Sequence, residues 1–145
     1  MFRLSPIKLW KNISVIIFLI AIIFTLIGTF TIHGELVVHW NSVGVPNNSS
    51  GKWILWVMLL EAFLSMFTHS SFSKKRPGQK PLSMEISGAF SSGLEATWTI
   101  VIIILVTYNF YPMIAIPIIG TIGIGLCYIL LVTIAYIRNR KDVKS

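Results

Sequence analysis

The sequence predicts an all-α integral membrane protein, a bundle of four transmembrane helices with both termini in the cytoplasm. Three observations predict it: 54% of the residues are hydrophobic and 12% are charged, the apolar residues form four long stretches, and the basic residues occupy alternate connecting segments. An ordinary soluble domain carries roughly 25% charged residues, so this chain lacks the polar side chains to cover its surface. The same apolar content excludes an intrinsically disordered chain.

The four apolar stretches set the predicted helices, because a helix needs about 20 apolar residues to cross the hydrocarbon layer. The predicted spans are residues 13–32, 53–69, 94–110 and 117–137. The first exceeds the roughly 7–15 apolar residues of a signal-peptide core, and no small-residue cleavage pattern follows it, so we expect a retained anchor. Pro112 and Pro117 interrupt the apolar segment between the last two spans, which favours a tight turn there.

The distribution of charge predicts the orientation and the domain organisation. Of the twelve Lys and Arg residues behind the net charge of +7, all except Lys52 precede the first span, lie in the loop between the second and third spans, or follow the fourth. The positive-inside rule assigns these segments to the cytoplasm. We therefore expect a membrane domain at 1–70 with an extracytoplasmic loop at 33–52, a basic cytoplasmic loop at 71–93, and a second helical pair with a basic tail at 94–145.

The basic residues point to lipid rather than to nucleic acid as a partner. They fall in short blocks between apolar stretches, whereas nucleic-acid binding needs positive charge gathered on one face. Lys74, Lys75 and Arg76 in the predicted cytoplasmic loop favour attraction to anionic lipid headgroups. Cys127 is the single cysteine of the chain, so an intramolecular disulfide is excluded.

The extracytoplasmic loop contains the residues with the most varied chemistry. Pro46, Asn47 and Asn48 predict a turn. If residues 35–40 are extended, Glu35 and His39 share one face, and His33 continues it. Imidazole and carboxylate are zinc ligands, but the spacing matches no zinc signature. We therefore favour packing and hydrogen bonding for this loop, and expect no cofactor.

The same loop carries a motif that spans its centre and its end. The motif residues are His39, Trp40, Asn41, Gly44, Pro46 and Lys52. This pattern resembles a bacterial membrane domain family of unknown function, found at the N-terminus of SdpI-type toxin-immunity proteins. The resemblance covers about residues 10–70. Val37 stands where the family has proline, and Asn47 where it has aspartate.

The resemblance implies a bacterial cell-membrane protein. Together with the loop itself, it favours the hypothesis that the six motif residues bind an extracellular peptide, a toxin or another membrane protein. SdpI-type proteins also carry a Gly-x-Arg-Thr-like cytoplasmic motif, which residues 70–93 lack. The expectation is therefore a binding or sensing protein of the immunity type, with that role resting on the outer loop alone.

Glu61 supports an alternative function, because it lies near the middle of the second predicted span. A charge at mid-bilayer costs roughly 2.5–3.5 kcal/mol on insertion scales, so such residues usually face a bundle interior. We expect the hydroxyl of Thr25 or Tyr128 to bond the Glu61 carboxyl at similar depth. Glu61 is then either a structural group or part of a polar path in a small transporter or accessory subunit. Four spans are few for a monomeric carrier, which leaves an oligomer open.

An enzyme is not expected. The sequence contains neither Gly-x-Ser-x-Gly nor His-Glu-x-x-His, and its five acidic residues are scattered. These motifs carry the nucleophile of many hydrolases and the metal site of many proteases. The chain therefore predicts binding or transport rather than catalysis.

Overall fold

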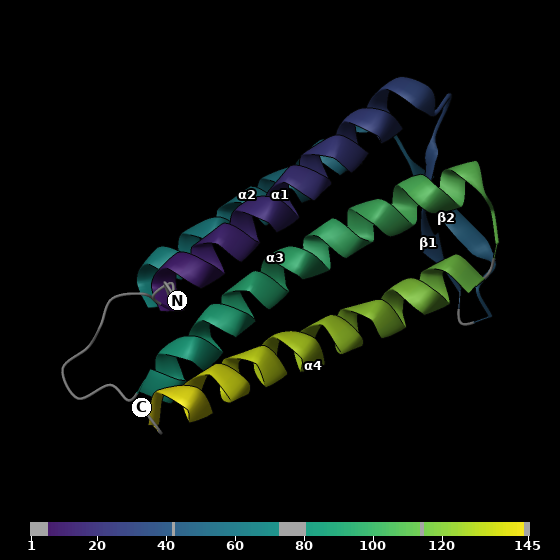
Figure 1. Cartoon of the computed structure of the whole chain (residues 1–145). Coiled ribbons are helices and arrows are strands. Elements are labelled where there is room, and N and C mark those ends of the chain that lie inside the picture. The colour runs from purple at the N-terminus through teal and green to yellow at the C-terminus, as the bar shows by residue number, and fades with distance from the viewer. Residues whose placement is uncertain (1–5, 42, 73–80, 114, 144–145) are drawn as a thin grey trace.

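The computed structural model describes residues 6–41, 43–72, 81–113 and 115–143. Its elements are α1 (Pro6–Thr31), β1 (Leu36–Trp40), β2 (Pro46–Ser50), α2 (Trp53–Phe72), α3 (Pro81–Phe110) and α4 (Ala115–Val143). The helices lie side by side, and the two strands sit at one end of the bundle, here called the hairpin end (Figure 1). The first residues of α1 and the last of α4 lie at the other end, here called the terminal end.

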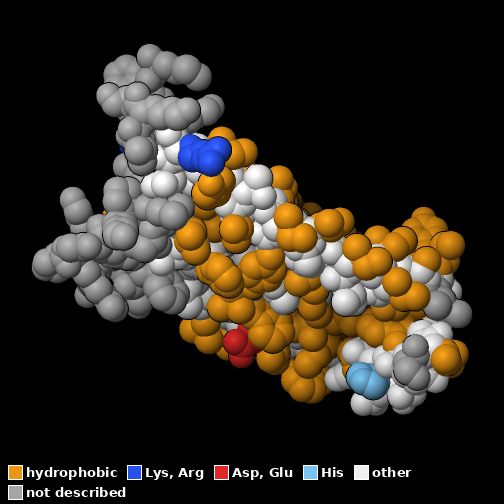
Figure 2. Space-filling model, turned by 90° about the horizontal axis from the view of Figure 1, so that it is seen from below, with side chains coloured by type: hydrophobic (Ala, Val, Ile, Leu, Met, Phe, Trp, Pro, Cys, Tyr) orange, Lys and Arg blue, Asp and Glu red, His pale blue; other side chains and the backbone are white. Residues whose placement is uncertain are grey.

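Among the residues that the structure describes, three helices are long and apolar enough to cross a membrane, namely Lys8–Thr31, Met84–Phe110 and Ala115–Arg140. The apolar part of α2, Trp53–Thr68, is shorter. Hydrophobic side chains dominate the face of the molecule seen in Figure 2. The prediction of an apolar helical bundle is therefore confirmed for three helices, and the second predicted span corresponds to the shorter helix.

The centre of the bundle is α3. It packs against α1, α2 and α4, and 56% of its apolar stretch is buried, against 22% for α1 and 11% for α4. Small residues allow this close packing. A Cβ on Gly28 of α1 would lie 2.7 Å from Leu55 Cδ1 and 2.7 Å from Val106 Cγ2. By contrast, α4 covers one side of α3 and leaves most of its own surface exposed.

Two apolar clusters fill the interior. The cluster toward the hairpin end contains Ala21, Ile32, Leu36, Leu55, Ile102, Leu105 and Val106. The cluster toward the terminal end contains Trp10, Ala89, Leu131 and Ala135. Leu36 belongs to the first cluster, so the hairpin is part of the same packed body as the helices. In a bilayer, side chains in such clusters are stabilised by close van der Waals packing, because lipid tails are as apolar as the side chains themselves.

The all-α prediction is wrong for the segment between the first two helices, which forms an antiparallel β-hairpin. The physical reason lies in local sequence. Gly34 has φ +88° and ends the helical path after α1, since few other residues adopt this conformation. Val37 and Val38 then favour an extended chain. The turn predicted at Pro46–Asn48 is also wrong, because these residues belong to β2.

The start of the third helix also differs from the sequence prediction. Pro81 begins α3, whereas the predicted span began at residue 94, so much of the expected polar loop is helical. Proline suits a first helical turn, where its missing N–H is not needed. The basic residues Lys74, Lys75, Arg76 and Lys80 lie outside the described residues.

The predicted tight turn between the last two helices is confirmed. The amide of Tyr111 donates to the Thr107 carbonyl at 2.9 Å, and the amide of Met113 donates to the Tyr111 carbonyl at 2.7 Å. Pro112 has no N–H to continue the helix after Tyr111, and Pro117 lies in the first turn of α4, where its missing N–H is not needed.

Candidate functional site

Two motif residues, Asn41 and Gly44, build the turn of the hairpin. The Asn41 side-chain oxygen accepts hydrogen bonds from the amides of Val43 and Val45, at 3.1 and 2.9 Å. The Gly44 amide donates to the Asn41 carbonyl at 2.9 Å, and Gly44 has φ +79°. Both residue types are therefore required by the turn itself. Pro46 follows as the first residue of β2, paired with Trp40.

Lys52 attaches the end of the hairpin to the end of α1. Its Nζ donates to the Thr29 carbonyl at 2.8 Å and to the Ile32 carbonyl at 3.2 Å. The last carbonyls of a helix lack backbone partners and carry partial negative charge, which an ammonium group satisfies. The structure thus gives this motif lysine a capping role across the α1–hairpin junction.

The inner side of the hairpin is anchored on α3. Trp40 stacks edge-on against Tyr108, with ring centroids 4.9 Å apart. The Val37 amide donates to the Asn109 side-chain oxygen at 3.1 Å, and Leu36 is fully buried. The indole N–H of Trp40 is buried without a hydrogen-bond partner among the described residues. These contacts hold the hairpin in one position on the bundle.

The outer side of the hairpin is polar and exposed. Nδ1 of His39 lies 2.6 Å from Oδ1 of Asn47, across the two strands. The Ser49 hydroxyl donates to the Glu35 carboxylate in a second cross-strand pair. All four side chains are exposed. Their ring nitrogen, amide, hydroxyl and carboxylate groups offer both hydrogen-bond donors and acceptors to a partner.

The three candidate metal ligands of the loop do not form a metal site. Among the described residues, no group of three or more His, Cys, Asp or Glu is placed to hold a metal ion. His39 is engaged with Asn47 and Glu35 with Ser49, while His33 is exposed before β1. The hairpin keeps Glu35 and His39 on one face, as an extended chain requires.

The structure does not bring together Glu61, Thr25 and Tyr128. The expectation that Glu61 faces the bundle interior is wrong, because its side chain is exposed. Thr25 is fully buried, and its hydroxyl has no hydrogen-bond partner among the described residues. Tyr128 packs beside Phe90, with ring centroids 5.9 Å apart. The helical rotation of α2, set by burial of Leu55 and Ala62, turns Glu61 outward.

A different acidic residue occupies the interior. Glu95 of α3 is fully buried, near the middle of the apolar stretch Met84–Phe110. Its two carboxyl oxygens have no hydrogen-bond partner of ordinary geometry among the described residues. The Ser14 side chain of α1 is its polar neighbour, and the Thr99 hydroxyl donates to the Glu95 carbonyl at 3.0 Å.

Glu95 belongs to a buried polar seam, defined as Ser14, Ser65, Ser91, Ser92, Glu95 and Thr99, all buried. The Thr68 and Ser91 hydroxyls hydrogen-bond between α2 and α3. These helices run in opposite directions (Figure 1). Ser65 lies about one turn from Thr68 toward the hairpin end, and Glu95 lies about one turn from Ser91 in the same direction. Ser65 and Glu95 are therefore at the same level of the bundle. The seam therefore joins faces of α1, α2 and α3 within the apolar part of the bundle.

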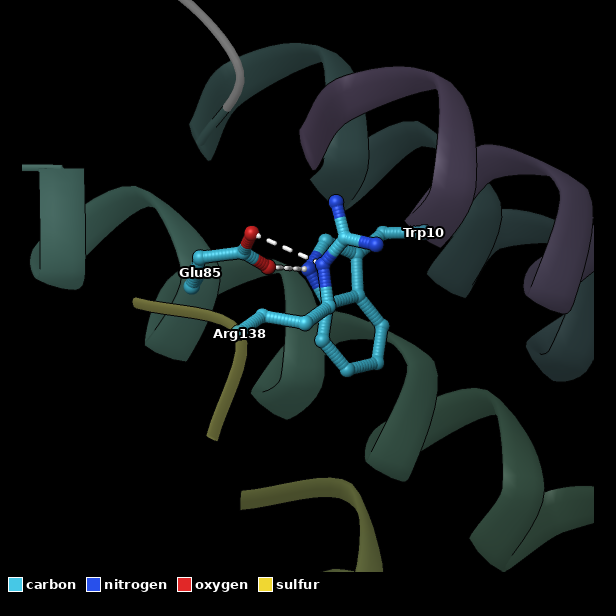
Figure 3. Close-up of polar contacts among 3 residues, drawn as sticks. All are labelled: Trp10, Glu85 and Arg138. Carbon is cyan, nitrogen blue, oxygen red and sulfur yellow. Dashed lines mark hydrogen bonds and ion pairs between the residues drawn. The ribbon is translucent and has the colours of Figure 1, made fainter. Parts of the chain in front are cut away.

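A second buried carboxylate, Glu85, lies at the terminal end of the bundle. It accepts a hydrogen bond from Trp10 Nε1 at 2.6 Å and pairs with Arg138 Nε at 3.1 Å. Figure 3 shows the indole and the guanidinium converging on this carboxylate from α1 and α4. We call these three residues the terminal-end clamp. It joins the ends of α1, α3 and α4.

The buried polar seam and the terminal-end clamp were missed by the sequence reading for the same reason. Placing the start of the third helix at residue 94 left Glu85 in a loop and Glu95 at a helix boundary. A helical signal was present: Glu85, Ser92, Glu95 and Thr99 recur at spacings of three, four and seven, which place them on one face. A polar face with helical spacing from residue 85 onward predicts a helix that begins before residue 94, closer to the observed start at Pro81.

The chain matches no protein-family model, no curated protein and no solved structure. The resemblance to the domain of SdpI-type proteins therefore rests on the loop residues alone and stays a prediction. Any function must be argued from the hairpin and the buried carboxyl groups.

Proposed function

We propose that this protein is a small multi-pass protein of the bacterial cell membrane that binds an extracytoplasmic peptide or membrane-protein partner through its hairpin. The observation that carries the proposal is the combination of a fixed inner face and an exposed polar outer face on that hairpin. A binding surface held rigid before contact loses little conformational entropy on binding. The outer face therefore suits recognition better than a free loop would.

The proposed orientation places the hairpin outside the cell and both termini in the cytoplasm. Lys8, Lys11 and Arg140 lie toward the terminal end, while Lys52 lies at the hairpin end. This asymmetry supports the orientation by the positive-inside rule. The Lys52 ammonium group donates hydrogen bonds to carbonyls at the end of α1, so its positive charge has a partner within the fold.

The chemistry of the outer face indicates the class of partner. His39, Asn47 and Ser49 present groups that pair with peptide amides and carbonyls, and hydrogen bonds to such groups give orientation and specificity. A toxin-immunity role is the form of this proposal that the resemblance to SdpI-type proteins favours. In that form, the motif residues Asn41, Gly44 and Lys52 shape the hairpin and leave His39 to contact the toxin.

A survival assay tests the proposal. Expression of the chain in a bacterium sensitive to a membrane-acting peptide toxin of the SdpI-immunity kind is expected to raise survival. The double variant His39→Ala/Asn47→Ala is expected to weaken toxin binding about tenfold, which corresponds to the loss of roughly two hydrogen bonds. Cells that express it should therefore survive only lower toxin concentrations than cells that express the wild type. Asn12→Ala removes an exposed amide at the opposite end of α1 and serves as the matched control.

Two results of the survival assay would contradict recognition by the hairpin. Membrane-inserted wild-type protein that gives no protection, or protection that survives the double variant unchanged, would exclude it. Equal losses in the double variant and in Asn12→Ala would point to reduced expression rather than to recognition.

A second candidate function is proton or ion movement, as a small transporter or an accessory subunit, and Glu95 favours it. In this proposal the polar path runs through Glu95, which is buried in the apolar part of the bundle, rather than through Glu61, which is exposed. A buried carboxyl within the hydrocarbon layer is costly, so such groups commonly serve ion pathways or proton relays. The hydroxyls of the buried polar seam supply further oxygen atoms around it.

A flux assay tests this second candidate. In liposomes that contain the protein and an internal pH-sensitive dye, an imposed membrane potential is expected to drive proton entry. Glu95→Gln keeps the shape of the side chain but cannot exchange a proton, so entry should fall to the rate of protein-free liposomes. Thr133→Val on the exposed face of α4 is the control. If Glu61→Gln abolishes proton entry and Glu95→Gln does not, the proton path includes Glu61 rather than Glu95.

A further inference from the structure

Glu61 is exposed at a depth where a membrane offers it no partner. It lies eight residues, or about 12 Å, along α2 from Trp53, which is near the centre of a hydrocarbon layer about 30 Å thick. Ionisable residues at such depth almost always face protein or water rather than lipid. A single copy of this chain leaves the carboxyl on its outer surface.

The side chains around Glu61 form a continuous apolar stripe. Val57, Leu60 and Leu64 are 41%, 54% and 49% exposed, and their spacing of three and four residues places them on one side of α2. The opposite side of the helix, with Leu55 and Ala62, is fully buried in this chain. The stripe around Glu61 is therefore available for a further helix.

We propose that α2 is a homodimer interface, in which the Glu61 stripe of one copy packs against the same stripe of a second copy. The two copies are related by a two-fold axis along the membrane normal, and the two Glu61 carboxyls hydrogen-bond to each other, one of them protonated and donating. This interface is isologous, as most two-fold interfaces are. It covers both carboxyls with a single contact.

Two arguments favour a second copy over another partner. Copies inserted in the same orientation hold every residue at the same depth as its counterpart, so a residue beside the axis meets itself. A carboxyl group is self-complementary because its protonated form donates and its other oxygens accept, which a lysine or arginine at this position would not be. The short apolar part of α2 adds a third contribution, since helices shorter than the hydrocarbon layer tend to associate.

Cysteine cross-linking in native membranes tests the interface. In a Cys127→Ala background, Val57→Cys and Leu64→Cys are each expected to give a disulfide-linked dimer on mild oxidation. Ile122→Cys is the matched control, because Ile122 is exposed on α4 about 10 Å from the start of that helix. Cross-linking of Ile122→Cys at the same rate as the α2 variants, or no cross-linking at any position, would overturn the proposal.

Variants of Glu61 test the carboxyl pair itself. Glu61→Gln retains a self-complementary side chain and is expected to keep the dimer, whereas Glu61→Leu should lower the association constant about fivefold, the worth of one interhelical hydrogen bond in a membrane. Association measured by energy transfer between labelled copies in liposomes gives this ratio. Equal association of the glutamine, leucine and wild-type chains would exclude the pair. The exposed position means that the fold of each copy should be unchanged, which circular dichroism verifies.

Discussion

Replacing Glu85 with alanine is expected to lower the free energy of unfolding by about 2–4 kcal/mol. The substitution removes the acceptor of the Trp10 indole N–H and the partner of the Arg138 guanidinium. Deleting one member of a buried pair leaves the other group desolvated without compensation, which costs more than the pair contributed. Thermal or denaturant unfolding in detergent micelles, followed by tryptophan fluorescence, measures the change.

The control for this clamp variant is Arg140→Ala. Arg140 is exposed, with its guanidinium carbon 5.0 Å from the centre of the Tyr136 ring, and exposed contacts of this kind contribute about 0.5–1 kcal/mol. Trp10→Phe keeps an aromatic ring but removes the N–H and part of the buried volume, so it should also lower the stability. A Glu85→Ala protein as stable as wild type would show that the terminal-end clamp does not hold α1, α3 and α4 together.

Replacing Gly88 with alanine is expected to destabilise the same end of the bundle by about 1–3 kcal/mol. A Cβ at Gly88 would lie 2.4 Å from Trp10 Cδ1 and 2.5 Å from Trp10 Cγ, and the rigid indole cannot turn away without leaving Glu85. Overpacking of a filled interior costs energy of this size because side chains or backbone must shift. The same unfolding measurement applies, and a red-shifted emission of Trp10 would report its displacement toward a more polar environment.

Gly125→Ala on α4 is the matched glycine control. A Cβ at Gly125 meets no other atom within 4 Å, and alanine favours a helix over glycine by about 1 kcal/mol in water. The control variant should therefore be neutral or more stable. If Gly88→Ala and Gly125→Ala change stability alike, the tight approach of Trp10 to α3 is not a determinant of the fold.

Hydropathy predicted the four helices because it depends on every residue of a segment, whereas the orientation inferred from charge stays a prediction. The β-hairpin was harder to predict, since it depends on single residues. Gly34 and Gly44 have positive φ, but a glycine in the sequence does not reveal that it uses this freedom. Asn41 was identified through the motif, yet its two hydrogen bonds to the turn become evident only once the chain is folded.

The carboxyl groups of α2 and α3 show why a position along an apolar helix does not by itself predict a site. Glu61 and Glu95 both lie within predicted apolar helices, but the rotation of each helix decides which one is buried. That rotation is set by packing of the small and aliphatic residues, such as Ala62 against the bundle interior. The sequence therefore indicated that an acidic residue would lie in the membrane, and tertiary packing determined which residue lies inside.

The position of α3 at the centre of the bundle has a consequence for the order of assembly during synthesis. Trp10 is made long before its hydrogen-bond partner Glu85, so α1 and α2 are complete before the helix that fills their inner faces exists. The emergence of α3 supplies that partner. The last helix then docks on α3, and Arg138 near its end reaches Glu85. Assembly of the terminal-end clamp thus requires nearly the whole chain, because its three residues come from the first, third and fourth helices.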